Sequence, residues 1–450
     1  MTPKPDRPAD LGMQAPNPTA WLPRPERLRF WAERIGHFGF WQLASQALQL
    51  ITGFLLVQWL SIEAYAQFGV ALSFQNMLGL LVDLGFSSAI IALVGDRIHD
   101  REVVGRHVRS ARTFRNKMLL TVGPLSALGF FWLARSHQWP FVSSLLIFFS
   151  ILGLLFFQGW TACYSPPLLM HLQIAPLFRP GVMLGTAKLA ACAAFHFAAV
   201  LGATAVCWFN TLAALATALI YRSHARPYLV EPSIPDPETN RAIRNYIAPL
   251  IPGIAFQAFQ GQIQVLLIST FGGNQSIAEV TALGRLSQLF VFLSSFNGVI
   301  VTPYIARVPN AHLALRYFQA ISLTVLVGAV LTGSAYLFPG IFLSLLGSKY
   351  HGLGAELGFS MLAASLAFIN FTLYGLNNAR RWIFHWTSTV NILGLIAIQA
   401  VLIATMSLTT TLNVMIFSAI TGLYPILVFV MTAIYGYRKD QEVIRPTEAS

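Results

Sequence analysis

The stretch AYAQFGVALSFQNMLGLLVDLGFSSAIIALVGDR, residues 64–97, decides how the rest of the chain is interpreted. It is long and apolar enough to cross a bilayer, yet it carries an aspartate near its middle. Polar or small residues spaced by four lie on one face of the helix it would form: Gln75, Gly79, Asp83 and Ser87. A helix surrounded by lipid would not carry that stripe. The stretch therefore predicts a transmembrane helix that faces a polar space inside the membrane.

The composition places the chain in a membrane. Of its 450 residues, 55% are hydrophobic and only 10% are charged, whereas soluble domains carry about 25% charged residues. The mean hydropathy is +0.62, and apolar runs of about 20 residues recur, which is typical of a polytopic helical membrane protein. No short apolar segment with a small-residue cleavage site precedes the first run, so we expect no cleaved signal peptide.

We expect an all-α polytopic fold of about 12 transmembrane helices, in two six-helix lobes around a central polar cavity. A polar, proline-containing break at residues 222–244 separates the two sets of six. The spans are predicted at residues 38–60, 64–94, 118–134, 141–163, 181–200 and 203–221, and then at 246–271, 277–305, 315–338, 353–376, 382–404 and 412–437.

The predicted spans divide the chain into five parts. Within the first part, residues 25–37 mix Arg, Leu, Phe and Trp and are suited to a short helix on the membrane surface. The parts are a cytoplasmic N-terminal tail (1–37), an N-lobe (38–230), a cytoplasmic linker (231–244), a C-lobe (245–437) and a cytoplasmic C-terminal tail (438–450).

Positive charge alternates between the predicted loops. Lys and Arg gather in the N-terminal tail, in every second loop and after the last span, whereas the other loops hold only Arg135 and Lys349. The positive-inside rule therefore places both termini in the cytoplasm. The same alternation accounts for the net charge of +12, so we expect no nucleic-acid partner.

The second half of the chain echoes the opening stretch. Residues 277–307, IAEVTALGRLSQLFVFLSSFNGVIVTPYIAR, occupy the equivalent place and contain Arg285. With six spans in each half the repeat is a parallel one, a common plan among transporters whose substrate site lies between the halves. We therefore expect residues 64–97 and 277–307 to form two walls of one cavity.

No catalytic set is present in the sequence. The histidines are scattered, and there is no HExxH, GxSxG or Walker motif and no pair of carboxylates at one depth. We therefore expect neither an enzyme nor a metal or other cofactor. The cysteines at 163, 192 and 207 lie in or beside apolar spans without metal-like spacing, which favours a packing role.

Basic residues inside the predicted spans are the strongest candidates for a site. Lys188 and Arg285 lie within spans, and Arg179 marks the cytoplasmic mouth of the fifth span. A Lys or Arg at mid-bilayer costs about 2.5–3.5 kcal/mol on insertion scales, so such residues normally face a cavity and serve a site. The alternative is a structural ion pair between Asp83 and Lys188 or Arg285.

Uncharged polar residues extend the candidate cavity lining. Hydrogen bonds between helices, worth under about 1 kcal/mol each, are the alternative explanation for any one of them. Gly181 and Gly185 form a GxxxG spacing that favours a helix-packing contact. The amide residues assigned to the cavity are Gln46, Asn76, Gln257, Gln260, Gln264 and Gln288.

Two segments resemble a known family. Residues 55–91, LLVQWLSIEAYAQFGVALSFQNMLGLLVDLGFSSAII, carry Leu60, Tyr65, Phe68 and the Asp83-Leu84-Gly85 trio. Residues 262–307 carry Arg285 and Pro303-Tyr304 in the second half. Both resemble the polysaccharide transporter (Wzx-like O-antigen flippase) family of the multidrug/oligosaccharidyl-lipid/polysaccharide exporter superfamily. Gln264 stands where many relatives have an acid.

The resemblance implies a flippase that moves a polyprenyl-pyrophosphate-linked oligosaccharide across the bacterial inner membrane by alternating access. Lys188, Arg285 and Arg179 would neutralise the pyrophosphate, the amides would replace sugar hydration, and Asp83 would bind a coupling proton or cation. The implied partners are the lipid-linked glycan and membrane lipids, with a glycan polymerase and glycosyltransferases as further candidates. The alternatives are a multidrug or organic-cation exporter of the same superfamily and a non-transporting membrane scaffold for glycan synthesis.

Overall fold

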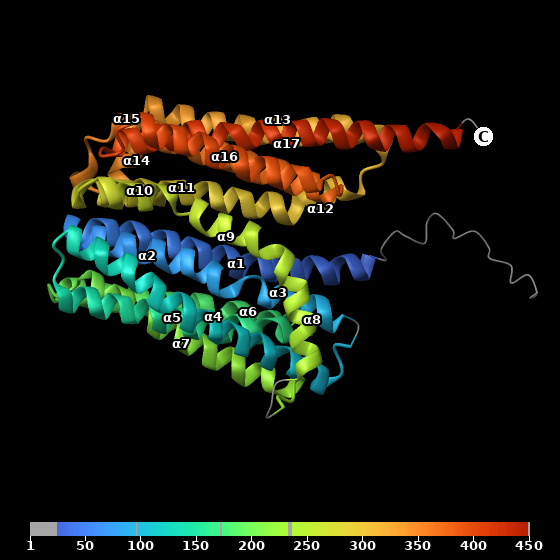
Figure 1. Cartoon of the computed structure of the whole chain (residues 1–450), viewed down its shortest axis with the longest axis horizontal. Coiled ribbons are helices and arrows are strands. Elements are labelled where there is room, and N and C mark those ends of the chain that lie inside the picture. Colours follow the sequence, from blue (N-terminus) through green and yellow to red (C-terminus); the bar gives the residue numbers. More distant parts are fainter. Residues whose placement is uncertain (1–24, 96, 172, 233–235, 449–450) are drawn as a thin grey trace, which may run out of the picture.

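The computed structural model describes residues 25–95, 97–171, 173–232 and 236–448, and within them it contains helices and no strand. The helices run roughly parallel and form two groups (Figure 1). The first group is made of α1 (Pro25–Trp59), α2 (Ile62–Asp83), α3 (Phe86–Val94), α4 (Arg101–Ser136), α5 (Phe141–Met170), α6 (Ile174–Phe197) and α7 (Ala203–Ala225).

The second group follows a connection that contains α8 (Pro237–Ile247), which packs across α3 and α4. It consists of α9 (Ile251–Gln260), α10 (Ile263–Phe271), α11 (Asn274–Phe296), a π-helical segment (Asn297–Val301), α12 (Thr302–Arg307), α13 (Asn310–Leu337), α14 (Pro339–Leu346), α15 (Gly354–Ala379), α16 (His385–Thr405) and α17 (Thr411–Glu448).

The described part of the chain has nine helices long and apolar enough to cross a membrane, and Pro237–Gln260 with Ile263–Phe271, bent by 52°, makes a tenth. Two further long helices, α1 and α6, pack against each other in the same bundle. Arg179 and Lys188 both lie within α6. The expectation of an all-α polytopic membrane fold in two helical lobes is confirmed.

Two predicted elements differ from the structure at their ends. Helix α1 runs without a break from Pro25, so residues 25–37 continue into the first span. Helix α4 begins at Arg101, where the Asp100 side chain accepts hydrogen bonds from the amides of Glu102 and Val103. The prediction that this span begins at residue 118 was therefore wrong. The charged residues between 101 and 117 lowered the hydropathy of this segment, which moved the predicted start of the span. Two of them, Arg112 and Arg115, form ion pairs within the protein.

The opening stretch is a broken helix, and the prediction of one continuous striped helix was wrong. Leu84 and Gly85 adopt left-handed φ angles of 42° and 82°, which end α2 at Asp83 before α3 restarts at Phe86. Glycine tolerates this conformation, whereas leucine is strained in it. The Ser87 hydroxyl still reaches back across the break and donates to Asp83 Oδ2 at 3.0 Å.

The two groups meet mainly through α2, which packs against α9, α10 and α11. Gly69 is the point of closest approach, because a Cβ placed there would lie 2.2 Å from Thr281 Oγ1 on α11. The two stretches predicted to form opposite cavity walls therefore touch directly at this depth. Any cavity between them is closed at the level of Gly69.

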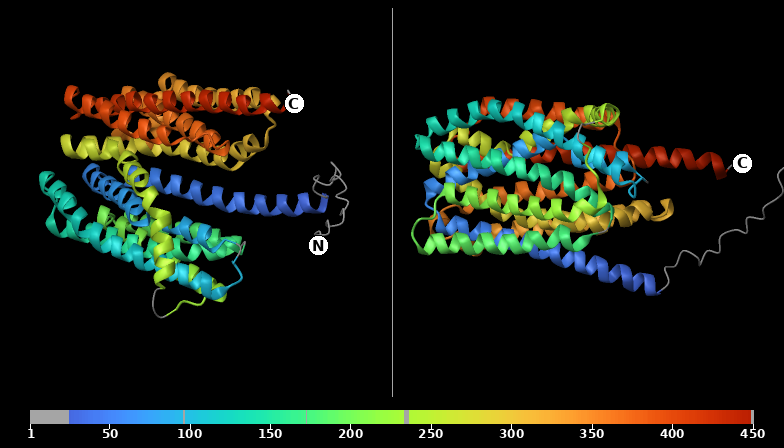
Figure 2. Two further views of the ribbon diagram at one scale, coloured as in Figure 1. Left: turned by 45° about the vertical axis from the view of Figure 1, so that its right-hand side comes forward. Right: turned by 90° about the horizontal axis from the view of Figure 1, so that it is seen from below.

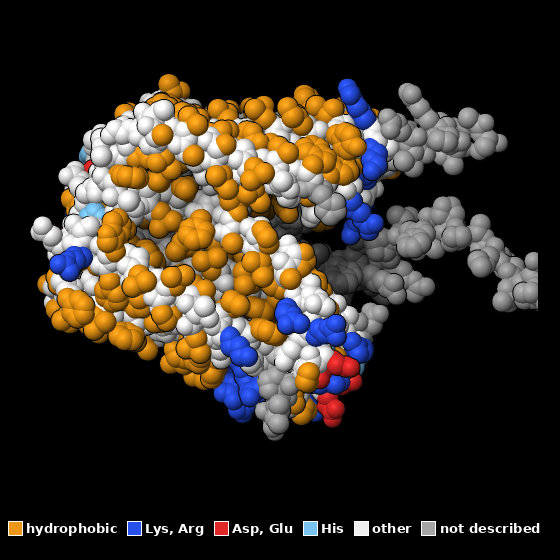
Figure 3. Space-filling view, viewed as in Figure 1, with side chains coloured by type: hydrophobic (Ala, Val, Ile, Leu, Met, Phe, Trp, Pro, Cys, Tyr) orange, Lys and Arg blue, Asp and Glu red, His pale blue; other side chains and the backbone are white. Residues whose placement is uncertain are grey.

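The ends of the bundle differ in charge. Helices α1 and α17 project from the same end (Figure 2). Lys and Arg side chains gather at that end, where the surface is notched between the two groups, and the long sides are dominated by hydrophobic side chains (Figure 3). The bundle is therefore joined at one end and open at the basic end.

Candidate functional site

The site centres on Arg285, which lies on α11 with only 8% of its surface exposed. Its Nε donates to the Tyr65 hydroxyl at 3.2 Å, and its guanidinium carbon lies 5.6 Å from the centre of the Phe68 ring. Both partners belong to α2 of the other helix group. The Arg285 Nη2 atom is buried and has no hydrogen-bond partner among the described residues. The guanidinium thus contacts Tyr65 and Phe68 across the interface, while its Nη2 donor makes no hydrogen bond to the described residues.

Local sequence explains why the arginine can reach this position. Gly53 on α1 leaves room for it, because a Cβ there would lie 3.3 Å from Arg285 Cδ. Side chains in a helix lean toward its N-terminus, so Arg285 extends toward the closed end of the bundle, where Tyr65 begins α2. Arg285 follows the first residue of α11 by eleven positions, about 17 Å along the axis. The site therefore lies at the inner limit of the cleft between the groups.

Lys188, the other predicted base, lies on α6. It donates from Nζ to Asn210 Oδ1 on α7 at 3.2 Å, within the first helix group. No carboxylate among the described residues pairs with Lys188 or Arg285, since the ion pairs recorded there join other arginines to Asp83 and Glu231. That Lys188 and Arg285 serve one site stays a prediction.

The other predicted residues are more dispersed. Arg179 is exposed on α6, with its guanidinium 5.7 Å from the ring centre of Trp41 on α1. Gln260 accepts a hydrogen bond from Gln399 at 2.8 Å, within the second group. The remaining amides line no single cluster: Asn76 and Gln257 are exposed, and Gln46, Gln264 and Gln288 are half-buried.

Asp83 lies in a different environment. Its Oδ1 accepts from Arg115 Nη1 at 2.7 Å, and Arg115 is 4% exposed in the middle of α4. The structural alternative had the wrong partner, because neither Lys188 nor Arg285 pairs with Asp83. Gly159 on α5 makes room for the arginine, as a Cβ there would lie 3.0 Å from Arg115 Nε. Asp83 and Arg115 form a closed ion pair inside the first group.

The connection between the groups is also held by charge. Arg112 Nη2 donates to Glu231 Oε2 at 2.6 Å, and the Tyr164 hydroxyl donates to Glu231 Oε1 at 2.6 Å. The amide of Val230 donates to the carbonyl of Arg101 at 2.9 Å, where Gly105 allows the strand-like segment to touch α4. The start of the connection therefore belongs structurally to the first group.

The closed end is joined by hydrogen bonds between the groups. Lys349 Nζ donates to the carbonyls of Gln58 and Leu60 at 3.0 and 2.7 Å, and Gln58 Nε2 donates to the Leu345 carbonyl at 3.0 Å. Two further contacts join His137 Nε2 to the Ser269 carbonyl at 2.7 Å and Trp139 Nε1 to Asn274 Oδ1 at 3.0 Å. These contacts close one end of the cleft.

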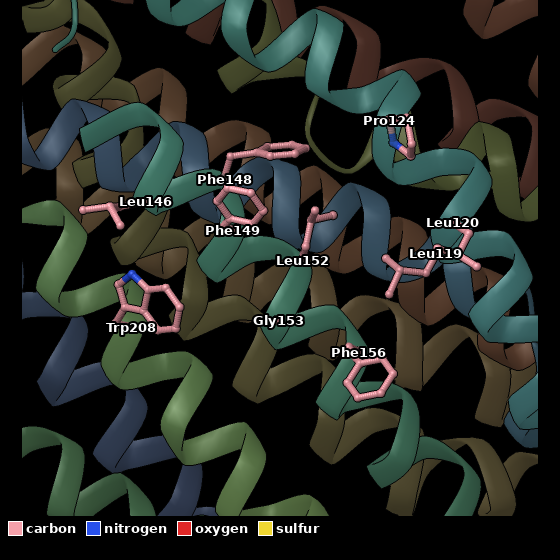
Figure 4. Close-up of a pocket in the computed structure, with 10 residues that line it drawn as sticks. All are labelled: Leu119, Leu120, Pro124, Leu146, Phe148, Phe149, Leu152, Gly153, Phe156 and Trp208. Carbon is pink, nitrogen blue, oxygen red and sulfur yellow. The ribbon is translucent and has the colours of Figure 1, made fainter. Parts of the chain in front are cut away.

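A large apolar recess lies away from these charges. It measures about 700 Å³ and is lined by apolar residues of α4 and α5 together with Trp208 of α7 (Figure 4). Leu120 and Phe149 are 76% and 54% exposed there, as expected of side chains that face lipid. Its lining is almost wholly apolar and holds no charged residue, with the Trp208 indole N–H as a donor, so we assign the site to Arg285 instead.

Several residues of the site were not assigned a binding role from the sequence. Tyr65 was noted only as part of a family motif, and Asn210 and Arg115 were not assigned to the cavity. Arg115 could have been found from the sequence. It follows the intramembrane Asp83 by 32 residues, so it can pair with Asp83 if the next helix begins well before Arg115. Tyr65 lies 220 residues from Arg285, and no spacing rule connects them.

Neither a protein-family model nor a curated protein sequence matches the chain. Solved structures do share its fold. The lipid II flippase MurJ in an inward closed conformation has a TM-score of 0.68 and 15% identity, over 89% of this chain and 89% of that chain. A multidrug resistance MATE family transporter of the MOP superfamily, in an inward-facing conformation, has a TM-score of 0.65 and 15% identity, over 88% of this chain and 96% of that chain.

An outward-facing structure with the same MATE family description has a lower TM-score, 0.54, at 13% identity, over 92% of this chain and 96% of that chain. The chain therefore shares the fold of these solved MOP superfamily transporters.

Proposed function

We propose that this protein is a flippase that moves a polyprenyl-pyrophosphate-linked oligosaccharide, or a related polysaccharide precursor, across the bacterial cytoplasmic membrane by alternating access. The observation that carries the proposal is Arg285, which is buried at the interface between the two helix groups and has no carboxylate partner among the described residues. Lys188 on α6 is a second base that no carboxylate of the described residues neutralises.

Electrostatics favours an anionic cargo. A buried charge without a partner is destabilising by several kcal/mol. A ligand that supplies negative charge would relieve this effect. The spare Nη2 donor of Arg285 would then make a charge-assisted hydrogen bond to a phosphate oxygen.

The rest of the cleft suits a lipid-linked sugar. Oligosaccharides lose hydration on entry, and exposed or half-buried amides such as Asn76, Gln257 and Gln264 offer both donors and acceptors in its place. Arg179, exposed beside the Trp41 ring, would meet the head group as it enters. The hydrocarbon tail would stay in the bilayer while the head group crosses between the groups.

Alternating access would reverse the present arrangement. The hydrogen bonds that join the closed end, among them those of Lys349 to Gln58 and Leu60, would break while the basic ends of the groups approach. The excess of Lys and Arg at the open end favours the cytoplasm for that end. Both termini would then lie in the cytoplasm, where glycosyltransferases would supply the cargo.

Asp83 is our candidate for energy coupling. Its carboxylate is already paired with Arg115, so a proton or cation would bind only by displacing that arginine. A dependence of transport on a proton or sodium gradient that disappears in Asp83→Asn would support this role.

The two alternatives explain less. A site for an organic cation should have anionic or aromatic walls. Here the cation would instead meet the positive charges of Arg285 and Lys188. A scaffold for glycan synthesis would gain nothing from buried bases that destabilise the fold.

The test is translocation in proteoliposomes. Purified protein is reconstituted with a fluorescent polyprenyl-pyrophosphate oligosaccharide, and the inward and outward head groups are counted with an impermeant enzyme that cleaves the sugar. Matched variants are Arg285→Gln with Arg135→Gln as control, and Lys188→Gln with Lys117→Gln as control, because both control residues are exposed. Efflux of an organic cation is measured in parallel.

We expect head-group movement in the wild type and in both controls, and its loss in Arg285→Gln. Movement of the organic cation alone would establish the exporter alternative. Movement of neither cargo by well-folded protein, together with a copurifying glycan enzyme, would favour the scaffold.

A further inference from the structure

A groove on the second helix group has a shape and polarity of its own. It lies between α11–α12 and α13 and has a volume of about 380 Å³. One rim is formed by Phe296, Ile300 and Tyr304, which are 56%, 52% and 53% exposed. Leu323 on α13 forms the opposite rim and is 61% exposed. These side chains project from the membrane-facing surface and enclose a narrow apolar channel.

The π-helical segment Asn297–Val301 shapes the floor of this groove. The Asn297 side chain turns inward and donates to Thr324 Oγ1 at 3.3 Å and to Thr372 Oγ1 at 2.8 Å. Its polar atoms are thereby satisfied inside the helix group, and the outward positions are left to apolar residues. Ala320 lines the α13 side and is small enough to leave depth there. Single-turn π-helical segments are often found at functional sites.

One end of the groove is polar and basic. Arg316 and Gln319 line it near the turn between α12 and α13, where Arg316 Nη1 donates to Gln319 Oε1 at 3.0 Å. No carboxylate among the described residues pairs with Arg316. This end lies on the basic side of the bundle, level with the last turns of α12 in Figure 1. The groove is therefore amphipathic along its length, with its cationic end toward the head-group region.

We propose that this groove binds an anionic phospholipid of the leaflet at the basic end, with one acyl chain in the apolar channel and the phosphate at Arg316. The apolar lining of the channel suits a hydrocarbon chain, and the single arginine at its mouth complements one phosphate. A guanidinium prefers phosphate because it offers parallel donors in a planar fork. The site is separate from Arg285 and does not depend on the cargo of the transporter.

The test is native mass spectrometry of the full-length protein released from mixed micelles of phosphatidylglycerol and phosphatidylcholine. The first comparison is Arg316→Gln against Arg307→Gln, an exposed arginine on α12 that does not line the groove. The second is Ala320→Phe, which fills the channel, with Ala320→Leu used if the larger residue lowers the yield of folded protein. A third arm adds a polyprenyl phosphate as competitor.

We expect the wild type and Arg307→Gln to retain one phosphatidylglycerol in preference to phosphatidylcholine. Arg316→Gln should lose that preference about tenfold, as expected for one charge-assisted contact, and filling the channel should abolish retention of both lipids. Equal losses in the two arginine variants would overturn the proposal, as would unchanged retention in the filled variant. Displacement by polyprenyl phosphate at equal concentration would show that the groove serves the carrier lipid instead.

Discussion

Two arginines inside the bundle illustrate opposite uses of a buried charge. Arg115 is 4% exposed and is neutralised at 2.7 Å by Asp83 on a neighbouring helix of the same group. Arg285 is 8% exposed, contacts a tyrosine and a phenyl ring across the interface between the groups, and keeps one buried donor without a partner. The first arrangement is neutral in charge, although Arg115 also keeps a buried Nε atom without a hydrogen-bond partner among the described residues. The second has no counter-charge among the described residues, which is why we propose that the cargo binds there.

The largest effect is expected from Arg285→Gln. Glutamine keeps a polar side chain but removes the charge and the donor fork, so binding of a pyrophosphate should weaken about 100-fold or more, equivalent to two charge-assisted hydrogen bonds. Transport should fall below detection in the proteoliposome assay. The melting temperature should stay the same or rise, because an uncompensated buried cation is removed.

A fall in melting temperature as large as that of an Asp83 variant would contradict this view of Arg285. It would mean that the arginine holds the fold together as Arg115 does. Arg285→Lys sharpens the comparison, since it keeps the charge and should retain part of the transport activity.

The second prediction concerns Asp83→Asn, which should destabilise the protein by about 3 kcal/mol. Breaking a buried pair leaves an uncompensated charge and typically costs 3–5 kcal/mol, and the 27% exposure of the Asp83 side chain favours the lower end. Thermal unfolding in detergent measures the effect. The double variant Asp83→Asn with Arg115→Gln should recover most of the loss, and additive losses would show that the two residues do not act as a pair.

Gly159→Ala is a milder way to disturb the same pair. The new Cβ would lie 3.0 Å from Arg115 Nε, so the arginine must shift, at about 1–2 kcal/mol. Gly129→Ala on α4 is the control, since nothing lies within 4 Å of its Cβ. Equal unfolding temperatures for the two alanine variants would show that Arg115 has room to move and that the pair is less rigid than we infer.

The smallest effect is expected from Lys349→Ala, which weakens the joined end by about 1 kcal/mol through loss of hydrogen bonds to two carbonyls. The population should shift toward the form that is open at that end. Spin labels at Ser136, the last residue of α4, and at His351, on a turn, report the change as a longer distance population, because both residues are exposed at the joined end. Lys117→Ala should leave the distances unchanged.

The existence of the spans was predictable, because apolar length alone dictates a membrane helix. Their ends were not. Arg115 was placed in a loop because hydropathy counts every charge as exposed, and it lies inside a helix because Asp83 neutralises it. The break after Asp83 was also missed. Leucine rarely adopts a left-handed conformation, so Leu84 did not indicate one, and Gly85 could not be distinguished from the other glycines among the 33 in the chain.

The candidate site was predictable in part. The physical cost of an intramembrane base pointed to Lys188 and Arg285 without any structure. Their surroundings required the fold, because Tyr65 lies 220 residues from Arg285, and the pairing of Lys188 with Asn210 depends on how α6 packs against α7. The amides could not be placed from the sequence at all: hydrogen bonding between helices and contact with cargo leave the same pattern, and Gln260 proves to bond Gln399.

The contact of Lys349 with the end of α1 has a consequence for biosynthesis. The carbonyls of Gln58 and Leu60 end the first helix, and their ammonium partner follows 291 and 289 residues later. During translation the last carbonyls of α1 therefore stay without this partner until Lys349 has been synthesised. A fragment that stops after α7 should fray there, and supplying the second half as a separate polypeptide should restore the cap.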